Sequence, residues 1–126
     1  MDKVNSPASP AILEEFVGVM GKLKAIIENE NDFLERGLPA ALLATTRRKS
    51  TLSRQYGVLG QELLDAEVER LLNDPNLSAT LLAAGAELQT MGEENRKLMQ
   101  RAVRATKRRV DAVMEAVKAN AADSEN

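Results

Sequence analysis

Two heptad-spaced stripes on either side of a Gly-Leu-Pro tripeptide constrain the fold of this chain more than any other feature. Before and after residues 37–39, stripe residues recur at alternating steps of three and four, the spacing that lines one side of a helix. The stripes comprise Leu13, Phe16, Met20, Leu23, Ile27, Glu30 and Leu34, and then Leu42, Thr45, Lys49, Leu52, Tyr56, Leu59, Leu63 and Ala66. If the chain reverses at Pro39, each residue of the first stripe faces one of the second. The sequence therefore predicts an antiparallel helical hairpin.

In this hairpin Glu30, the charged residue of the first stripe, falls opposite Lys49, the charged residue of the second. Both side chains can reach past the seam into water along their flexible stems. If they are buried together, they fix the register of the hairpin rather than add stability, because desolvation offsets much of their attraction. We assign Glu30 and Lys49 as structural register residues.

Helix-start signals divide the chain into three helices. Ser9-Pro10 is a hydroxyl cap followed by proline, and Asp74-Pro75 repeats this signal. Aromatic residues make up 2% of the 126 residues, which favours a thin, elongated all-α fold over a globule. We predict an elongated antiparallel three-helix bundle or coiled coil. Its parts are a flexible N-terminus (1–9), a single helical domain (10–121) with helices at about 10–36, 39–73 and 75–120, and a disordered tail (122–126).

The third helix is predicted to overhang the first hairpin turn. Its own stripe comprises Leu77, Leu81, Ala84, Leu88, Met91, Asn95, Leu98, Ala102 and Ala105, and then slips by one position. Counted from a turn at Pro75, the level of Pro39 corresponds to about Val110, so residues 110–121 project. This end carries an apolar face formed by Val110, Val113, Met114, Val117 and Ala121. The face either pairs with another protein, which we favour, or belongs to a frayed or folded-back terminus.

The composition argues against catalysis. The chain has no His and no Cys, and so lacks the usual ligands of zinc, iron and copper, the thiol nucleophile and the best proton shuttle at neutral pH. It also contains no glycine-rich phosphate loop. We predict that it is not an enzyme and has no catalytic, metal-binding or cofactor-binding residues. Residues 1–10 are polar, and the longest uninterrupted apolar run, residues 38–44, is too short to span a bilayer. These features predict a cytoplasmic protein without stable membrane insertion.

A basic stretch without acidic residues lies in the third helix. It comprises Arg96, Lys97, Arg101, Arg104, Lys107, Arg108 and Arg109. Such a helix suggests nucleic-acid or membrane-surface binding. At the same level, however, the first helix carries four acidic residues, and the net charge is only -2. These acidic residues are Glu28, Glu30, Asp32 and Glu35. We therefore predict that the two blocks neutralise each other and that nucleic acid is not a partner, since no aromatic residue lies among the basic residues to stack on bases.

Five glycines fall inside the predicted helices at one height of the bundle: Gly18, Gly21, Gly57, Gly60 and Gly92. Each costs a helix interior about 0.5 to 1 kcal/mol relative to Ala. Because all five lie off the stripe positions, we predict a pliable waist rather than sites of close packing.

The chain resembles the FlgN-type flagellar export chaperones over about residues 12–118. The resemblance is carried by the acidic segment 28–35 and then by Leu42-Leu43, Lys49, Leu52, Tyr56 and Leu59. It implies a cytoplasmic chaperone that keeps hook-associated (hook-filament junction) proteins unassembled and delivers these clients to the flagellar type III export apparatus. In that family the C-terminal helix binds the client, which here points to Val103, Val110, Val113, Met114 and Val117. Leu38-Pro39 departs from the family, whose members commonly place an Asp before the second helix.

Two other functions stay open. One is a generic coiled-coil adaptor or oligomerisation protein, in which the exposed apolar face pairs with itself. The other is a small nucleic-acid-binding protein that uses the basic helix. We predict a monomer or a weak homo-oligomer.

Overall fold

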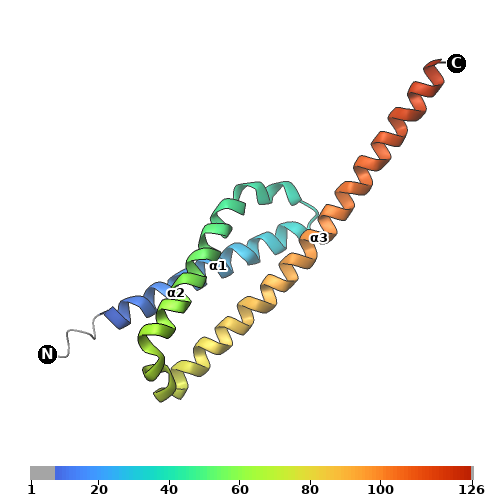
Figure 1. Cartoon of the computed structure of the whole chain (residues 1–126). Helices are drawn as coiled ribbons and strands as arrows, with labels where there is room; N and C mark the ends of the chain where they lie inside the picture. Colours follow the sequence, from blue (N-terminus) through green and yellow to red (C-terminus); the bar gives the residue numbers. More distant parts are fainter. Residues whose placement is uncertain (1–7, 126) are drawn as a thin grey trace.

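Residues 8–125 are described by the structure, a computed structural model (Figure 1). The elements, in order, are α1 (Ala8–Glu35), the 3-10 helix η2 (Pro39–Ala44), α2 (Thr46–Asn73) and α3 (Pro75–Glu125). No strand occurs in these residues, and the predicted all-α class is confirmed. The expectations for residues 1–7 and 126 lie outside the described residues.

The helix boundaries differ from the predicted ones. α1 begins at Ala8, so Ser9-Pro10 lies within its first turn. α3 continues to Glu125, past the predicted end and through most of the predicted tail. The predicted second helix is divided at Thr45, because the Thr45 N–H donates to the carbonyl of Leu42 at 3.1 Å, three residues back. Its first six residues therefore form a 3-10 helix.

Gly37 ends α1 in the left-handed conformation, with a φ of 76°. The Leu38 N–H donates to the Phe33 carbonyl at 2.9 Å, and the Gly37 N–H donates to the Leu34 carbonyl at 3.1 Å. These are the two hydrogen bonds of a Schellman motif, which favours glycine because its central residue needs a positive φ. Pro39 then opens η2, where its missing N–H costs nothing.

The second turn forms as predicted. The carboxylate of Asp74 accepts a hydrogen bond from the Leu77 N–H at 3.1 Å, and Pro75 is the first residue of α3. The Ser78 hydroxyl donates to the Leu71 carbonyl and ties the start of α3 to the end of α2. Only one residue therefore separates these two helices.

The core lies along the predicted stripes. Its main cluster comprises Phe16, Val19, Met20, Leu23, Ile27, Leu52, Leu59, Leu63 and Leu88, and a smaller one near the first turn comprises Leu34, Leu42 and Leu98. One stripe member is misplaced, because Ala66 is exposed and Glu67 is buried instead. Glu67 has a φ of -128° and a ψ of 18°, which interrupts α2 and changes the face that it presents to α1 and α3.

Gly60 lies against an aromatic pair. The rings of Phe16 and Tyr56 stack with centroids 5.1 Å apart, and a Cβ at position 60 would stand 3.3 Å from Phe16 Cε1. The expectation that the helix glycines avoid close packing is wrong here, because the Phe16 ring occupies the space above Gly60. The other four of these glycines, Gly18, Gly21, Gly57 and Gly92, have no such neighbour within 4 Å.

α3 is the longest element, and its last part extends away from the other helices (orange to red in Figure 1). All nine residues of its stripe up to Ala105 are buried or half-buried, whereas every residue from Thr106 to Asp123 is exposed. Lys24 of α1 pairs with Glu87 of α3 at 3.0 Å. The hydrogen bond and the charge of Glu87 raise the pKa of Lys24 above its ordinary value.

Within residues 8–125, no helix combines the length and apolar character needed to cross a membrane.

Candidate functional site

The five predicted partner-binding residues are all exposed on α3. Their exposed fractions are 67% for Val103, 53% for Val110, 61% for Val113, 52% for Met114 and 55% for Val117. Val103, Val110 and Val117 are seven residues apart, and Val113 and Met114 lie between the last two, so these side chains lie along one side of the helix. A continuous face of half-exposed apolar side chains is typical of a surface that binds a partner.

Val103 lines an apolar hollow of about 480 Å³ between η2 and α3, which we call the η2 hollow. Leu42 closes its floor, and Leu43 at its edge is 83% exposed. The full lining comprises Leu34, Pro39, Leu42, Leu43, Thr46, Met99, Ala102, Val103, Thr106 and Lys107. Neither Leu43 nor Met99 was among the predicted site residues. The available signal for Leu43 was its position next to Leu42. Only one of two neighbouring residues can face a core, so the other is left on the surface.

The next hollow along α3 measures about 250 Å³ and is lined by Thr106, Arg109, Val110, Val113 and Met114. Thr106 also lines the η2 hollow, so the two join into one surface along the helix. Val117 lies beyond both hollows.

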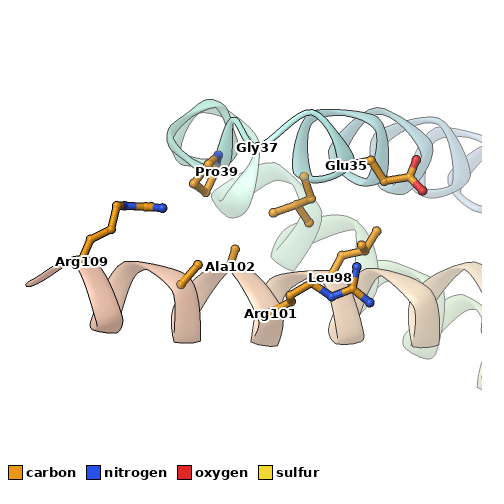
Figure 2. Close-up of a pocket in the computed structure, with 9 residues that line it drawn as sticks. Glu35, Gly37, Pro39, Leu98, Arg101, Ala102 and Arg109 are labelled. Atoms are coloured by element: carbon orange, nitrogen blue, oxygen red, sulfur yellow. The ribbon is translucent and has the colours of Figure 1, made fainter. Parts of the chain in front are cut away.

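A hollow of about 410 Å³ lies on the other side of the first turn, between α3 and residues 34–39. Figure 2 shows Arg109 reaching from α3 toward Pro39, with Ala102 facing the turn. The residues near Pro39 thus lie beside residues 98–109 of α3. The predicted level of Pro39, at about Val110, therefore differs by roughly two helical turns from the middle of this range.

A fourth hollow, of about 730 Å³, lies between α2 and α3. Three of its lining side chains are cations, from Lys49, Arg96 and Arg104, and none is a carboxylate. Asn95, Met99, Gln100 and Val103 complete it. We call it the cationic hollow, and it shares Met99 and Val103 with the η2 hollow.

Glu30 and Lys49 meet beside the cationic hollow, with Lys49 Nζ 2.7 Å from Glu30 Oε1. Glu30 is only 1% exposed, so of the two interpretations of this pair the structure favours burial over solvation. The Thr45 hydroxyl donates to Glu30 Oε2 at 2.6 Å, and Lys49 Nζ also donates to Asn95 Oδ1 at 2.9 Å. Asn95 Nδ2 in turn donates to Asn31 Oδ1 at 2.9 Å. The pair is thus part of a polar network that joins α1, α2 and α3.

Three members of this network, Thr45, Asn31 and Asn95, were not predicted, and Asn95 is the one that α3 contributes. Its position in the third stripe was known, and an amide among apolar stripe residues was the available signal. No buried side-chain nitrogen or oxygen of the described residues lacks a hydrogen-bond partner. The network therefore carries no unsatisfied group that would mark a ligand site.

The predicted proximity of the two charged blocks is found at Glu35, which lines one hollow with Arg101 and Arg109, but no direct ion pair joins the blocks in the described residues. Asp32 pairs with Arg36 at 2.6 Å, within α1, and Lys107 pairs with Asp111 at 3.0 Å, within α3. Apart from Glu30, residues of both blocks are exposed, and the ion pairs that Asp32 and Lys107 form are with residues four positions away on the same helix.

A separate apolar hollow of about 520 Å³ opens at the other end of the molecule, between α2 and α3. Phe16 and Tyr56 contribute to it, and the exposed Leu64 and Leu82 flank it. We call it the Tyr56 hollow. The sequence analysis did not predict it, because these two leucines lie off the stripes.

Comparison with protein-family models, with curated proteins and with solved structures gives no match. The function must therefore be inferred from the residues of the surface itself. In the described part of the chain, no three Asp or Glu residues come together in a way that could hold a metal ion.

Proposed function

We propose that this protein is a cytoplasmic chaperone of flagellar type III export. In this proposal it binds hook-associated proteins through the face of Val103, Val110, Val113, Met114 and Val117, keeps them unassembled and passes them to the export apparatus. The observation that carries the proposal is the exposure of these five side chains, between 52% and 67%, along one helix. The resemblance to the FlgN-type chaperones, whose C-terminal helix binds the client, gives the face its role.

The proposal includes a specific architecture. We infer that α1, α2 and α3 form an antiparallel three-helix bundle whose third helix overhangs the first turn. The contact of Glu30 with Lys49 and the exposure of every residue from Thr106 to Asp123 support it. An overhanging helix leaves its inner face free for a helix from another protein.

The proposed mechanism is masking. Hook-associated proteins of this kind assemble through amphipathic terminal helices, and such a helix can instead complete a bundle with the overhang. Burying the exposed remainder of each apolar side chain contributes on the order of 1 kcal/mol. Five such residues contribute about 5 kcal/mol, whereas reversible micromolar binding corresponds to about 8 kcal/mol and association has an entropic cost, so the η2 hollow must add further contact area. Reversibility is what delivery to an export apparatus requires.

The test is co-purification with co-expressed hook-associated proteins, followed by titration. The variant V113S/V117S removes apolar area from the face. The control A112S/A119S makes the same polar change on the opposite side of the helix, where both residues are also exposed. We expect V113S/V117S to bind about tenfold more weakly or worse, and the control to bind like the parent.

Two outcomes would contradict the proposal: the parent protein binds no hook-associated protein, or V113S/V117S binds as well as the parent. In the second case, a loss of binding in L64S/L82S would assign the client to the Tyr56 hollow. A concentration-dependent dimer that V113S/V117S dissociates, seen by light scattering without any client binding, would favour the coiled-coil adaptor instead.

A further inference from the structure

We propose that the segment docking on this surface is an acidic amphipathic helix. Its apolar side chains contact Val103 and Val110, and its carboxylates contact Arg96 and Arg104. This inference rests on the proposed function and specifies the chemistry of the client segment, which the exposed valines alone do not.

The first support is unneutralised charge. Seven basic residues lie between positions 96 and 109, and all of them are exposed. In the part of the chain that the structure describes, only Lys107 of these seven forms an ion pair, with Asp111 of the next turn. The whole chain carries a net charge of -2, so this positive charge is a local property of α3. A partner with the opposite charge would be attracted here and a basic one repelled.

The second support is the position of Val103 between two different hollows. It lines the apolar η2 hollow on one side and the cationic hollow on the other. Lys49 is already bound to Glu30, so the arginines Arg96 and Arg104 are the cations available there. A helix lying over Val103 thus places one flank on apolar side chains and the other on guanidinium groups. Carboxylates on that second flank would form charge-assisted hydrogen bonds.

The charge pattern also sets a direction along the surface. Lys107 and Arg109 accompany the apolar face as far as Val110, whereas Asp111 and Glu115 follow. The surface from Val103 to Val117 is roughly 20 Å long, about four helical turns. The acidic residues of the partner are therefore expected on the half that faces residues 96–109.

A nucleic acid is the rival partner for the same cations. None of the chain's three aromatic residues, Phe16, Phe33 and Tyr56, lines the η2 hollow or the cationic hollow, so no ring there can stack on a base. A nucleic acid would also leave the apolar η2 hollow uncovered. An acidic helix uses both the cations and the apolar residues, and so fits the surface better.

The experiment uses the full chain and three synthetic helical peptides that share their apolar positions and differ only in flanking residues, which are Glu, Gln or Lys. Binding is measured by fluorescence anisotropy at 50 mM and 500 mM salt. We expect the Glu peptide to bind at least about fivefold more tightly than the Gln peptide, and the Lys peptide most weakly. The difference should shrink at high salt, where the Debye length falls to a few ångströms.

A matched pair of variants locates the effect. R96Q/R104Q removes two charges at the cationic hollow, and R47Q/R48Q removes two exposed charges on α2 that line none of the hollows described above. We expect R96Q/R104Q to bind the Glu peptide about threefold to tenfold more weakly than the parent does, and to bind the Gln peptide with unchanged affinity. R47Q/R48Q should change neither, and circular dichroism confirms that both variants fold.

Several results would overturn the inference. These are equal binding of the Glu and Gln peptides, tighter binding of the Lys peptide, equal losses in both variants, or no binding of any peptide at 100 µM. Stronger competition by a single-stranded oligonucleotide or by anionic vesicles than by unlabelled Glu peptide would also overturn it. If a hook-associated protein still co-purifies, only this inference fails. If the Glu peptide binds but no hook-associated protein does, the proposed function fails instead.

Discussion

Glu30 is the most deeply buried large side chain of the described residues, and its partners determine its effect on stability. Its carboxylate accepts hydrogen bonds from Thr45 and Lys49, and Asn95 holds Lys49 from the other side. Buried ion pairs of this kind roughly balance attraction against desolvation. A partner lost from the network, however, leaves a buried charge without compensation.

Replacing Lys49 by Met tests this balance. The change keeps most of the side-chain volume but leaves Glu30 buried without its countercharge. We expect the free energy of unfolding to fall by about 2 to 4 kcal/mol, measured by urea denaturation. Arg48→Met, at the exposed neighbouring position, should change it by less than about 0.5 kcal/mol. Equal losses in the two variants would show that the network does not depend on charge.

The contact of Glu30 with Lys49 was predictable, because both charges stand at stripe positions equally far from the turn. The role of Asn95 was not predictable. The register of α3 was inferred from a second turn, and its error of roughly two helical turns moves a residue by about 10 Å along the helix axis. That error is enough to separate Asn95 from Lys49. The role of the network in fixing the register stays a prediction.

At the scale of the helices, the sequence predicted a helix start that depends on a single side chain. It did not predict where an α-helix gives way to a 3-10 helix. Asp74 caps α3 through its own carboxylate, so the signal is local. The 3-10 geometry of η2 depends on whether Thr45 bonds three or four residues back, and hydrophobic spacing over six residues does not distinguish these. The non-helical backbone at Glu67 was equally unpredictable, because the helical spacing of the sequence continues before and after this residue.

Two glycines of α2 provide a test of packing against helix propensity. Gly57 is exposed, and a Cβ there would meet nothing within 4 Å, so Gly57→Ala should raise the free energy of unfolding by about 0.5 to 1 kcal/mol. Gly60→Ala gains the same propensity but brings a methyl group within 3.3 Å of Phe16. We expect that crowding to cancel the gain or reverse it. Thermal unfolding of both variants decides, and equal stabilisation would mean that the Phe16 ring moves aside freely.

At the scale of the whole molecule, α3 has two different halves. Its 51 residues extend about 75 Å, and the core lies against its first part. The residues from Thr106 to Asp123 are all exposed and must rely on local hydrogen bonds and side-chain pairs such as Lys107 with Asp111. The stability of the chain is therefore concentrated at one end.

Hydrogen exchange should reveal this gradient. In dilute free protein, amides from Thr106 to Asp123 should exchange orders of magnitude faster than those from Phe16 to Leu34, because an isolated helix of that length is marginal in water. Mass spectrometry with peptide resolution measures both regions. A bound client should slow exchange from about Val103 to Val117. Strong protection of this segment in the free monomer would show that another part of the chain covers it.

The stacked pair of Phe16 and Tyr56 makes the protein its own optical reporter. The chain contains one Tyr and no Trp, so its intrinsic ultraviolet emission arises at a single point of the core. That point also borders α3, since a Cβ at Gly85 would stand 3.7 Å from the Tyr56 hydroxyl oxygen. Tyrosine fluorescence therefore reports how α1, α2 and α3 pack around Tyr56. An event confined to the end of α3 does not change it. A change in that fluorescence on adding a partner would mean that binding at the end of α3 alters the packing of the core.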